Sequence, residues 1–305
     1  MADTGKALVN THLAGLSDMG AADIKNFRQV WKTIEPKRRR EIIMRLNELA
    51  SDSVELNFDN IFLSSLRDPE ADVRSEAING LWENEQAALI PLLIDLLNNA
   101  PEEKVQATAA QALGRFALMA EINSIAPKYA IQVGQALLDV FNGRNKSVEV
   151  RRRALEAVSP LTTEQVKAAI KTAYESLDER LKISAVYAMG KNCDTKWLPF
   201  VLKELKNSDV EIRYEAVTAC GEIGDEDIMQ YLIPAANDED IDVQVAVMQA
   251  LGKIGGNEAK LYLQKHADEP NEALKDAIDT ALNEISILSD MTVFDIAPQS
   301  DKHEH

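Results

Sequence analysis

The residues that most often do chemistry in proteins are sparse in this chain and lie far apart. Zinc and iron sites need clustered His, Cys and carboxylate ligands, and its four histidines and two cysteines show no such spacing. Nucleophilic catalysis needs a base beside the nucleophile, and the body of the chain offers only His266. The sequence therefore predicts no catalytic residues, no metal site and no bound cofactor. The residues considered are His12, His266, His303, His305, Cys193 and Cys220.

An acidic stretch, residues 222–242, is a second candidate for chemistry, because it holds eight carboxylates and no Lys or Arg. Calcium loops need regularly spaced oxygen ligands around a central glycine, and that spacing is absent. We interpret these residues as acids in the first turns of helices, where the helix dipole favours negative charge. They also suit a basic partner. The eight are Glu222, Asp225, Glu226, Asp227, Asp238, Glu239, Asp240 and Asp242.

Basic residues cluster at 37–40 and at 151–153. Both clusters could bind phosphate, but they are isolated on a chain whose net charge is −17. The charge is uneven, with −2 on residues 1–153 and −15 on residues 154–305. An acidic surface repels nucleic acids and anionic membranes. We therefore expect a protein partner with a basic or neutral surface, and neither nucleic acid nor a membrane.

The sequence gives no sign of export or membrane insertion. The first residues lack the apolar core of a signal peptide. The most apolar stretch, residues 87–97, falls far short of the ~18 residues that a membrane span needs. Two cysteines are too few for a disulfide framework. We expect a cytoplasmic protein.

The elements that carry these residues follow a repeat of 31 residues. Each copy begins at an anchor, in most copies apolar, followed by a long polar residue, and apolar or small residues recur 4, 7, 8 and 11 positions later. These offsets form a stripe along one face of a helix. Toward the N-terminus the spacing of the copies becomes 35, 32 and 45 residues. The eight anchors are Arg38, Val73, Val105, Val150, Leu181, Ile212, Val243 and Leu274.

Capping residues and glycines mark the expected ends of the striped helices. A side chain three residues before an anchor can accept hydrogen bonds from free backbone N–H groups, and Asp178, Asp209, Asp240 and Asn271 stand there. Glycines that follow the last residues of a stripe are typical of helix ends. They are Gly190, Gly221, Gly224, Gly252 and Gly255.

A second apolar segment lies between successive stripes, so each unit is predicted to read helix, turn, helix, turn. Small residues in the second helix let neighbouring helices approach. The extra residues of the 45-residue interval, around 121–127 and 142–147, are expected in connections, where they cost little. A period of this length predicts stacked units rather than one globular core. The prediction is an all-α, right-handed α-solenoid of about eight helix pairs.

The two ends of the chain depart from the repeat. Residues 1–20 are small and polar and are expected to be flexible, whereas a short amphipathic helix at 24–34 would cap the first unit. The solenoid, with this cap, would span residues 21–287. Residues 288–305 would form a tail that is either disordered or packed on the last repeat or a partner.

The motif Asp-x-x-apolar-Arg-x-x-Ala-x-x-Ala-apolar-Gly is clearest at residues 209–221, and residues 240–252 repeat it with Gln244 for Arg and Val247 for Ala. Over roughly residues 36–287 the chain resembles HEAT repeats, and specifically the short HEAT-like repeats of phycobilisome lyases. The resemblance implies a ladder of bonds between turn carboxylates and basic side chains of stacked repeats. The expected acidic and basic members are Asp209 with Arg213, Asp178 with Lys182, and Glu70 with Arg74.

One set of residues could form a binding surface. Two positions after an anchor, a side chain should face away from the core stripe, and three consecutive units place an apolar residue there. In the family that the chain resembles, the second helices line the concave face. An exposed apolar strip on that face would mark a partner surface, unless the twist of the solenoid buries it against a neighbouring unit. The candidates are Ile183, Tyr214 and Val245, with Tyr187 one turn beyond Ile183.

The sequence thus favours a non-enzymatic scaffold or adaptor that binds a protein partner on the concave face. The alternative is a subunit of a phycobilin-type lyase or chromophore-attachment factor. That alternative is implied by the resemblance alone, because the family includes scaffolds, adaptors, lyase subunits and a few enzymes.

Overall fold

The structure, a computed structural model, describes the backbone of residues 7–295 and the side chains of that range except Glu226 and residues 288–295. Within this range the chain forms helices and no strand. It divides into two compact units, Met1–Ala169 and Ile170–His305, which we call unit 1 and unit 2. Each unit is a stack of helix pairs, and the fold is an all-α solenoid.

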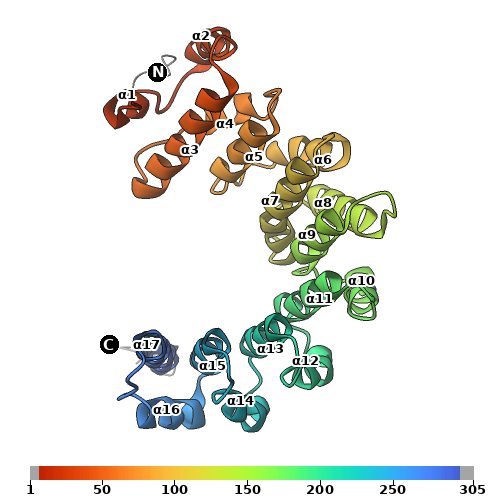
Figure 1. Cartoon of the computed structure of the whole chain (residues 1–305), viewed down its shortest axis with the longest axis vertical. Helices are drawn as coiled ribbons and strands as arrows, with labels where there is room; N and C mark the ends of the chain where they lie inside the picture. Colours follow the sequence, from red (N-terminus) through yellow and green to blue (C-terminus); the bar gives the residue numbers. More distant parts are fainter. Residues whose placement is uncertain (1–6, 296–305) are drawn as a thin grey trace, which may run out of the picture. The chain divides into compact units, whose positions relative to one another are not determined.

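In unit 1 the helices form two rows (Figure 1). The second helices of the pairs, α3, α5, α7 and α9, pack side by side in one row. The first helices, α2, α4, α6 and α8, lie in the other, and α1 packs on α3. The bounds are α1 (Asn10–Ala14), α2 (Ala21–Trp31), α3 (Pro36–Asp52), α4 (Asp59–Ser65), α5 (Ala71–Gly80), α6 (Leu89–Asn99), α7 (Glu103–Glu121), α8 (Pro127–Asn142) and α9 (Val148–Val158).

Unit 2 repeats this arrangement. Its second-helix row contains α11, α13, α15 and α17, each packed on the next, and its first-helix row contains α12, α14 and α16 (Figure 1). Helix α10 (Glu164–Tyr174) crosses the boundary between the units. The other bounds are α11 (Glu179–Asn192), η1 (Thr195–Trp197), α12 (Leu198–Glu204), α13 (Val210–Ile223), η2 (Glu226–Ile228), α14 (Met229–Ala235), α15 (Ile241–Ile254), α16 (Gly256–Lys265) and α17 (Glu272–Asp295).

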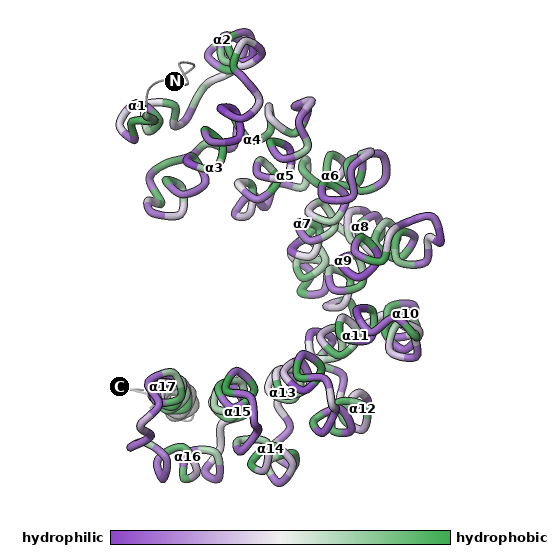
Figure 2. The backbone as a smooth tube through the Cα atoms, viewed as in Figure 1, coloured by the Kyte–Doolittle hydropathy of each residue, from purple (hydrophilic) through white to green (hydrophobic). Residues whose placement is uncertain are grey.

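The repeat predicted from the sequence is the repeat of the structure. All eight anchors are buried, each at the same place near the start of a second helix. Seven of the eight anchors are aliphatic, and burying such a side chain contributes roughly 1.5–3 kcal/mol. Hydrophobic and hydrophilic stretches alternate along the helices, as two-layer packing requires (Figure 2).

Predicted helix starts are confirmed. The Oδ1 atom of Asp209 accepts hydrogen bonds from the backbone N–H groups of Glu211 and Ile212 at 2.8 and 3.2 Å. The side chains of Asp178, Asp240 and Asn271 accept equivalent bonds at the starts of α11, α15 and α17. Such caps stabilise a helix by about 1 kcal/mol each.

The interpretation of three glycines as helix ends is wrong. Gly190, Gly221 and Gly252 lie in the last turns of α11, α13 and α15, where a Cβ would come within 2.7–2.8 Å of an alanine Cα on the next second helix. The glycine is needed because two helices touch there. The helices end instead at positions with positive φ: Gly224 (72°), Gly255 (71°) and, for α11, Cys193 (53°).

The expectation that the 45-residue interval adds only connections also needs correction. The short connections around 122–126 and 143–147 are present, but α7 has 19 residues and α8 has 16, against 14 in α13 and 7 in α12. Much of the extra sequence therefore lengthens the helix pair. Longer helices bury additional apolar residues, whereas longer loops would not.

Near the ends of the chain, helices extend beyond the predicted limits. Residues 10–14 form α1, which buries Leu13 completely, so part of the segment expected to be flexible is packed. Helix α2 buries Ile24, Phe27 and Trp31 at the place predicted for the cap. Helix α17 continues to Asp295, beyond the expected boundary at 288. Residues 1–6 and 296–305 lie outside the described residues.

Candidate functional site

A ladder of charged hydrogen bonds joins neighbouring repeats. The guanidinium of Arg213, one residue after its anchor, donates from Nε and Nη2 to the Asp238 carboxylate of the following repeat at 2.8 and 2.9 Å. Its Nη1 donates to the backbone carbonyls of Asn207 and Ser208. One buried arginine thus holds the turn before its own helix and the turn of the next repeat.

The same position plays the same role in other repeats. Arg39 pairs with Asp68 at 3.0–3.1 Å, and Lys182 pairs with Glu204 at 3.0 Å. Arg74 pairs with Glu102 and donates to the backbone carbonyls of two loop residues. Recurrence in both units indicates a structural function, since a catalytic pair would be unique.

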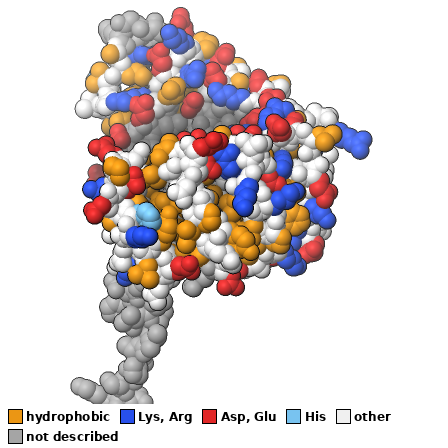
Figure 3. All heavy atoms as spheres, turned by 60° about the horizontal axis from the view of Figure 1, so that its bottom comes forward, with side chains coloured by type: hydrophobic (Ala, Val, Ile, Leu, Met, Phe, Trp, Pro, Cys, Tyr) orange, Lys and Arg blue, Asp and Glu red, His pale blue; other side chains and the backbone are white. Residues whose placement is uncertain are grey.

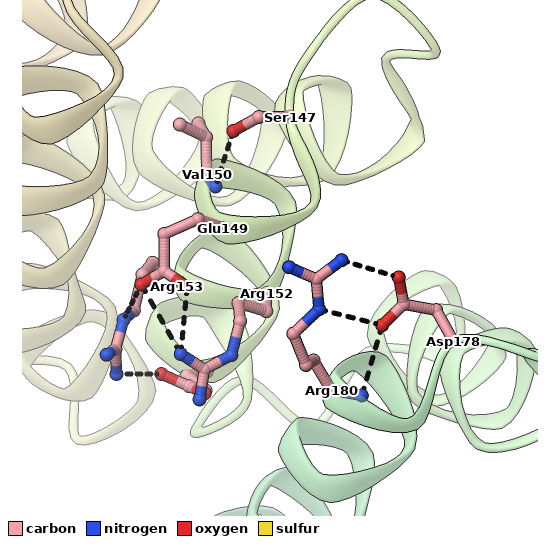
Figure 4. A network of polar contacts seen from close by, with 8 residues as sticks. Ser147, Glu149, Val150, Arg152, Arg153, Asp178 and Arg180 are labelled. Atoms are coloured by element: carbon pink, nitrogen blue, oxygen red, sulfur yellow. Dashed lines mark hydrogen bonds and ion pairs between the residues drawn. The ribbon is translucent and has the colours of Figure 1, made fainter.

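The acidic members of the ladder differ from the prediction. We expected Asp209 opposite Arg213, Asp178 opposite Lys182 and Glu70 opposite Arg74. Asp209 and Asp178 are instead occupied as helix caps, and Arg180 folds back on Asp178 at 2.8 Å (Figure 4). The basic side chains pair instead with carboxylates of the next repeat.

The pKa shifts along the ladder follow from these bonds. Hydrogen bonds from Arg213 lower the pKa of Asp238, and they outweigh the opposing effect of burial. Burial raises the pKa of Glu204, but hydrogen bonds from Tyr174 and two other side chains bring it below its usual value. Both carboxylates are therefore held charged, which suits structural ion pairs rather than proton transfer.

Two of the three arginines at 151–153 pair with carboxylates of their own helix. Arg152 and Arg153 pair with Glu149 and Glu156 on α9 at 2.8–3.5 Å (Figure 4). Arg151 donates from Nε to the backbone carbonyl of Phe141 at 2.8 Å. These arginines serve packing within unit 1 and do not form an open phosphate site.

Acidic residues of the stretch 222–242 also form ion pairs and helix caps that stabilise the fold. Glu222 pairs with Lys191 and Lys253 on the two flanking second helices. Asp238 belongs to the ladder, and Asp240 caps α15. Within the described part of the chain, no three His, Cys, Asp or Glu side chains gather as metal ligands would. Cys220 is fully buried, and burial raises its pKa to about 12.

The four predicted surface residues do not form one exposed strip. Ile183 is 7% exposed and belongs to the core, whereas Tyr214 is 37% exposed. Tyr187 and Val245 are half-buried. The solvent exposure of a side chain at the edge of a helical stripe depends on the size of its neighbours. The position of the residue relative to the anchor does not give that size. Ile183 is therefore corrected to a core residue, and binding by the other three stays a prediction.

The structure adds two residues that the sequence analysis missed. Val210 and Ile241, the first residues of α13 and α15, are 42% and 39% exposed. Each lies four positions before Tyr214 or Val245, and residues four apart share a helix face. Because α13 packs on α15, these four apolar residues occupy matching positions on two neighbouring helices. We call Val210, Tyr214, Ile241 and Val245 the α13–α15 patch.

Charged residues delimit the α13–α15 patch. At the two patch offsets, the neighbouring helix α17 carries Glu272 and Asp276, and α11 carries Glu179 at the first of them. Glu211 and Asp242 follow Val210 and Ile241 directly and are exposed. Unit 2 has 13 Lys and Arg against 27 Asp and Glu, a net charge of −14. The patch is therefore apolar, whereas the unit that carries it is strongly acidic.

The opposite row of unit 2 has a different surface. Figure 3 shows the face that carries α12, α14 and α16, where hydrophobic side chains lie among charges of both signs. Tyr231 of α14 is 50% exposed on this row. None of the described helices is long and apolar enough to cross a bilayer.

Comparison with solved structures supports the fold. The complex of CpcE and CpcF of phycocyanin lyase from Nostoc sp. PCC7120 is similar over 93% of this chain and 97% of its own, with a TM-score of 0.52 and 16% identity. Human deoxyhypusine hydroxylase is similar over 91% of this chain and 94% of its own, with a TM-score of 0.37 and 17% identity. At 16% identity, the likeness to the lyase complex shows the repeat fold alone.

Sequence comparison identifies the family. No curated protein matches the chain. The family profile described as HEAT repeats matches residues 60–128 and 198–283, which together make 155 of 305 residues. These ranges include the ladder members Arg74 and Arg213 and the close glycine contacts of α13 and α15. The chain belongs to the HEAT-repeat family.

Proposed function

We propose that this chain is a non-enzymatic scaffold or adaptor that holds a protein partner on the second-helix row of unit 2, the row that lines the concave face in HEAT solenoids. The observation that supports this most is the α13–α15 patch. It places Val210, Tyr214 and Ile241, each more than a third exposed, on two helices packed side by side. Contiguous exposed apolar side chains mark interaction surfaces.

The architecture suits binding by shape. Helices α13 and α15 pack closely at Gly221, so the patch is preorganised. Binding therefore causes only a small loss of conformational entropy. Tyr214 supplies a rigid apolar body with a polar tip, the type of side chain that dominates binding energy at interfaces. The acidic surroundings would steer a basic partner and disfavour an acidic one.

Affinity capture from native lysate tests this proposal. The full chain should retain a specific protein that the Tyr214→Glu variant loses, because a charge within the patch would have to be desolvated on binding. Tyr231→Glu is the matched control, since it makes the same change at an exposed tyrosine on the other row of unit 2. Equal retention by the wild type and Tyr214→Glu, or loss with Tyr231→Glu alone, would exclude the patch.

Stability measurements separate binding from folding. Tyr214 is partly exposed, so Tyr214→Glu should change the midpoint of thermal unfolding by only a few degrees. A collapse of the unfolding transition would show that the tyrosine supports the fold rather than a partner.

As part of this proposal we place the protein in the cytoplasm. Cys193 and Cys220 are both free thiols, which fits a reducing compartment. Detection of the native protein in a periplasmic or secreted fraction would contradict this assignment.

A second candidate is a subunit of a phycobilin-type lyase or chromophore-attachment factor. The structural similarity to a phycocyanin lyase over 93% of the chain favours it, although that similarity concerns the fold. The chain would then change the absorption spectrum of an added bilin and promote its transfer to an acceptor protein. An unchanged spectrum and no transfer would exclude this candidate.

A further inference from the structure

Unit 1 contains a groove of about 630 Å³ that lies apart from the α13–α15 patch in the chain. Residues of α2, α4 and α6 line it, together with the loop that follows α4. Leu63 of α4 and Leu92 and Leu96 of α6 provide half-buried apolar walls. The volume falls within the range of sites that take small ligands or a few residues of a peptide.

The polar floor of the groove is self-contained. Asp68 accepts hydrogen bonds from the Nε1 of Trp31 at 2.7 Å and from the Nη2 of Arg39 at 3.1 Å. All three side chains are buried, so the Arg39 guanidinium balances the Asp68 carboxylate. The floor therefore has no net charge, and the charge of the groove is set by the exposed residues at its rim.

That rim is basic. Arg28, Lys32 and Arg67 line it and are exposed. Within the described residues, Arg28 donates from Nε to Ser64 at 2.9 Å and from neither terminal nitrogen, so these two can bind a ligand. Among the residues that the structure describes, Lys32 and Arg67 form no ion pair. Three cations thus face a groove whose one exposed carboxylate is Asp95.

The equivalent groove of unit 2 shows that this charge is not a general feature of the repeat. It has a volume of about 440 Å³ and the same kind of floor, formed by the Arg213–Asp238 pair. Its charged residues are two cations and two carboxylates, whereas the unit 1 groove has four cations and two carboxylates. A basic groove on a chain of net charge −17 is local and would attract an anionic group to one place.

We propose that the groove between α4 and α6 in unit 1 binds a short acidic segment of a protein partner. Carboxylates of the segment pair with Arg28, Lys32 and Arg67, and an aliphatic side chain packs between Leu63 and Leu96. Arginine suits this role because its planar guanidinium can donate two parallel hydrogen bonds to a carboxylate. This surface goes beyond the α13–α15 patch and would select the opposite charge, so the two proposals can fail independently.

The shape of the groove disfavours the other anionic ligands. Three leucines along the walls give no hydrogen bonds to a bare phosphate, and they suit a ligand with an apolar part. Single-stranded nucleic acid is held by bases stacked on aromatic faces, and Trp31, the aromatic residue that lines the groove, is buried with its indole N–H bonded to Asp68.

Fluorescence anisotropy of the full chain with short labelled peptides tests the proposal. A fluorescein-labelled peptide of alternating glutamate and leucine should bind, and raised salt should weaken it. A lysine–leucine peptide of the same length should not compete at this groove. A glutamate–glycine peptide should bind about tenfold more weakly, because it lacks the apolar anchor.

Variants locate the binding site. Arg67→Glu and Lys32→Glu should each weaken the glutamate–leucine peptide by about tenfold or more, since they place a carboxylate opposite a carboxylate. Arg144→Glu is the matched control, because it makes the same change at an exposed arginine of unit 1 outside the groove. The affinity of this variant for the glutamate–leucine peptide should stay within about twofold of that of the wild type. Lys206→Glu makes the change in the unit 2 groove and should likewise have little effect.

Three results would overturn the proposal. Unchanged affinity in Arg67→Glu and Lys32→Glu would place any binding elsewhere. Displacement of the bound glutamate–leucine peptide by an equal concentration of the lysine–leucine peptide would show that the groove does not select by charge. Equal affinity for the glutamate–glycine peptide, together with full competition by inorganic phosphate, would show a small-anion site instead of a peptide groove.

Discussion

Gly221 of α13 lies directly against Ala250 of α15, so closely that a Cβ on Gly221 would stand 2.8 Å from the Ala250 Cα. Gly190 meets Ala219 and Gly252 meets Ala281 in the same way, one repeat earlier and one repeat later. The three contacts recur at the same offsets and hold the second-helix row of unit 2 together. Close packing of backbones gives the row a fixed geometry.

Substitution of Gly221 tests how much the contact contributes. Gly221→Ala should lower the free energy of unfolding by about 1–3 kcal/mol, because the new methyl group must push α13 away from α15. The measurement is urea unfolding followed by circular dichroism. Gly114→Ala should cost less, since its Cβ would lie 3.2 Å from the nearest Cα, and Gly15→Ala should be close to neutral. The reverse order would contradict the packing described here.

Removal of a ladder arginine should be costly. Arg213→Ala removes a buried guanidinium and leaves the carboxylate of Asp238, whose side chain is 10% exposed, without its partner, and breaking such a pair costs about 3–5 kcal/mol. Arg180→Ala is the control within unit 2. Arg180 is exposed and pairs with its near neighbour Asp178, so the loss should stay below about 1 kcal/mol. Similar losses of unfolding free energy in the two variants would show that the ladder does not hold the repeats.

The ladder also makes stability depend on pH. Bonds from Arg213 lower the pKa of Asp238 in the folded state, so the contribution of this pair is present above the ordinary aspartate pKa and is lost as pH falls through the lowered value. The stability difference between wild type and Asp238→Asn should therefore be largest near neutral pH and shrink below about pH 4. Denaturant unfolding across this range measures it. A difference that grows on acidification would contradict the assignment.

The two cysteines should react differently with a thiol reagent. Cys220 is fully buried and its pKa is raised to about 12, so it should not react in the folded protein. Cys193 is exposed, although burial of its thiol and the nearby Glu222 raise its pKa, so it should react slowly and faster at alkaline pH. Mass spectrometry of the labelled protein identifies the site. Rapid labelling of Cys220 in the folded protein would show that the buried side of α13 becomes exposed to solvent.

The fold was predictable because its strongest signals are periodic. From Val150 onward the anchors recur every 31 residues, as do the caps from Asp178, and a helix with one apolar face has few other ways to bury it. Distances between helices were not predictable in the same way. Gly221 at a helix contact and Gly224 at a helix end look alike in one sequence, and only their backbone geometry separates them.

The candidate surface was predictable only in part. Tyr214 and Val245 follow from the offset, but Ile183 at the same offset is buried by its neighbours. Val210 and Ile241 were missed because they directly follow the capping aspartates. The sequence there is interpreted as the start of a helix rather than as part of its exposed face. An offset two residues before the anchor would have found them, since it shares a helix face with the offset two residues after it.

Hydrogen–deuterium exchange of the chain with and without its captured partner tests the central proposal most directly. Binding on the second-helix row predicts slower exchange at the N-terminal turns of α13 and α15, residues 210–218 and 241–249, with α12 and α14 unchanged. Protection confined to α12 and α14, or no protection in unit 2 at all, would contradict it.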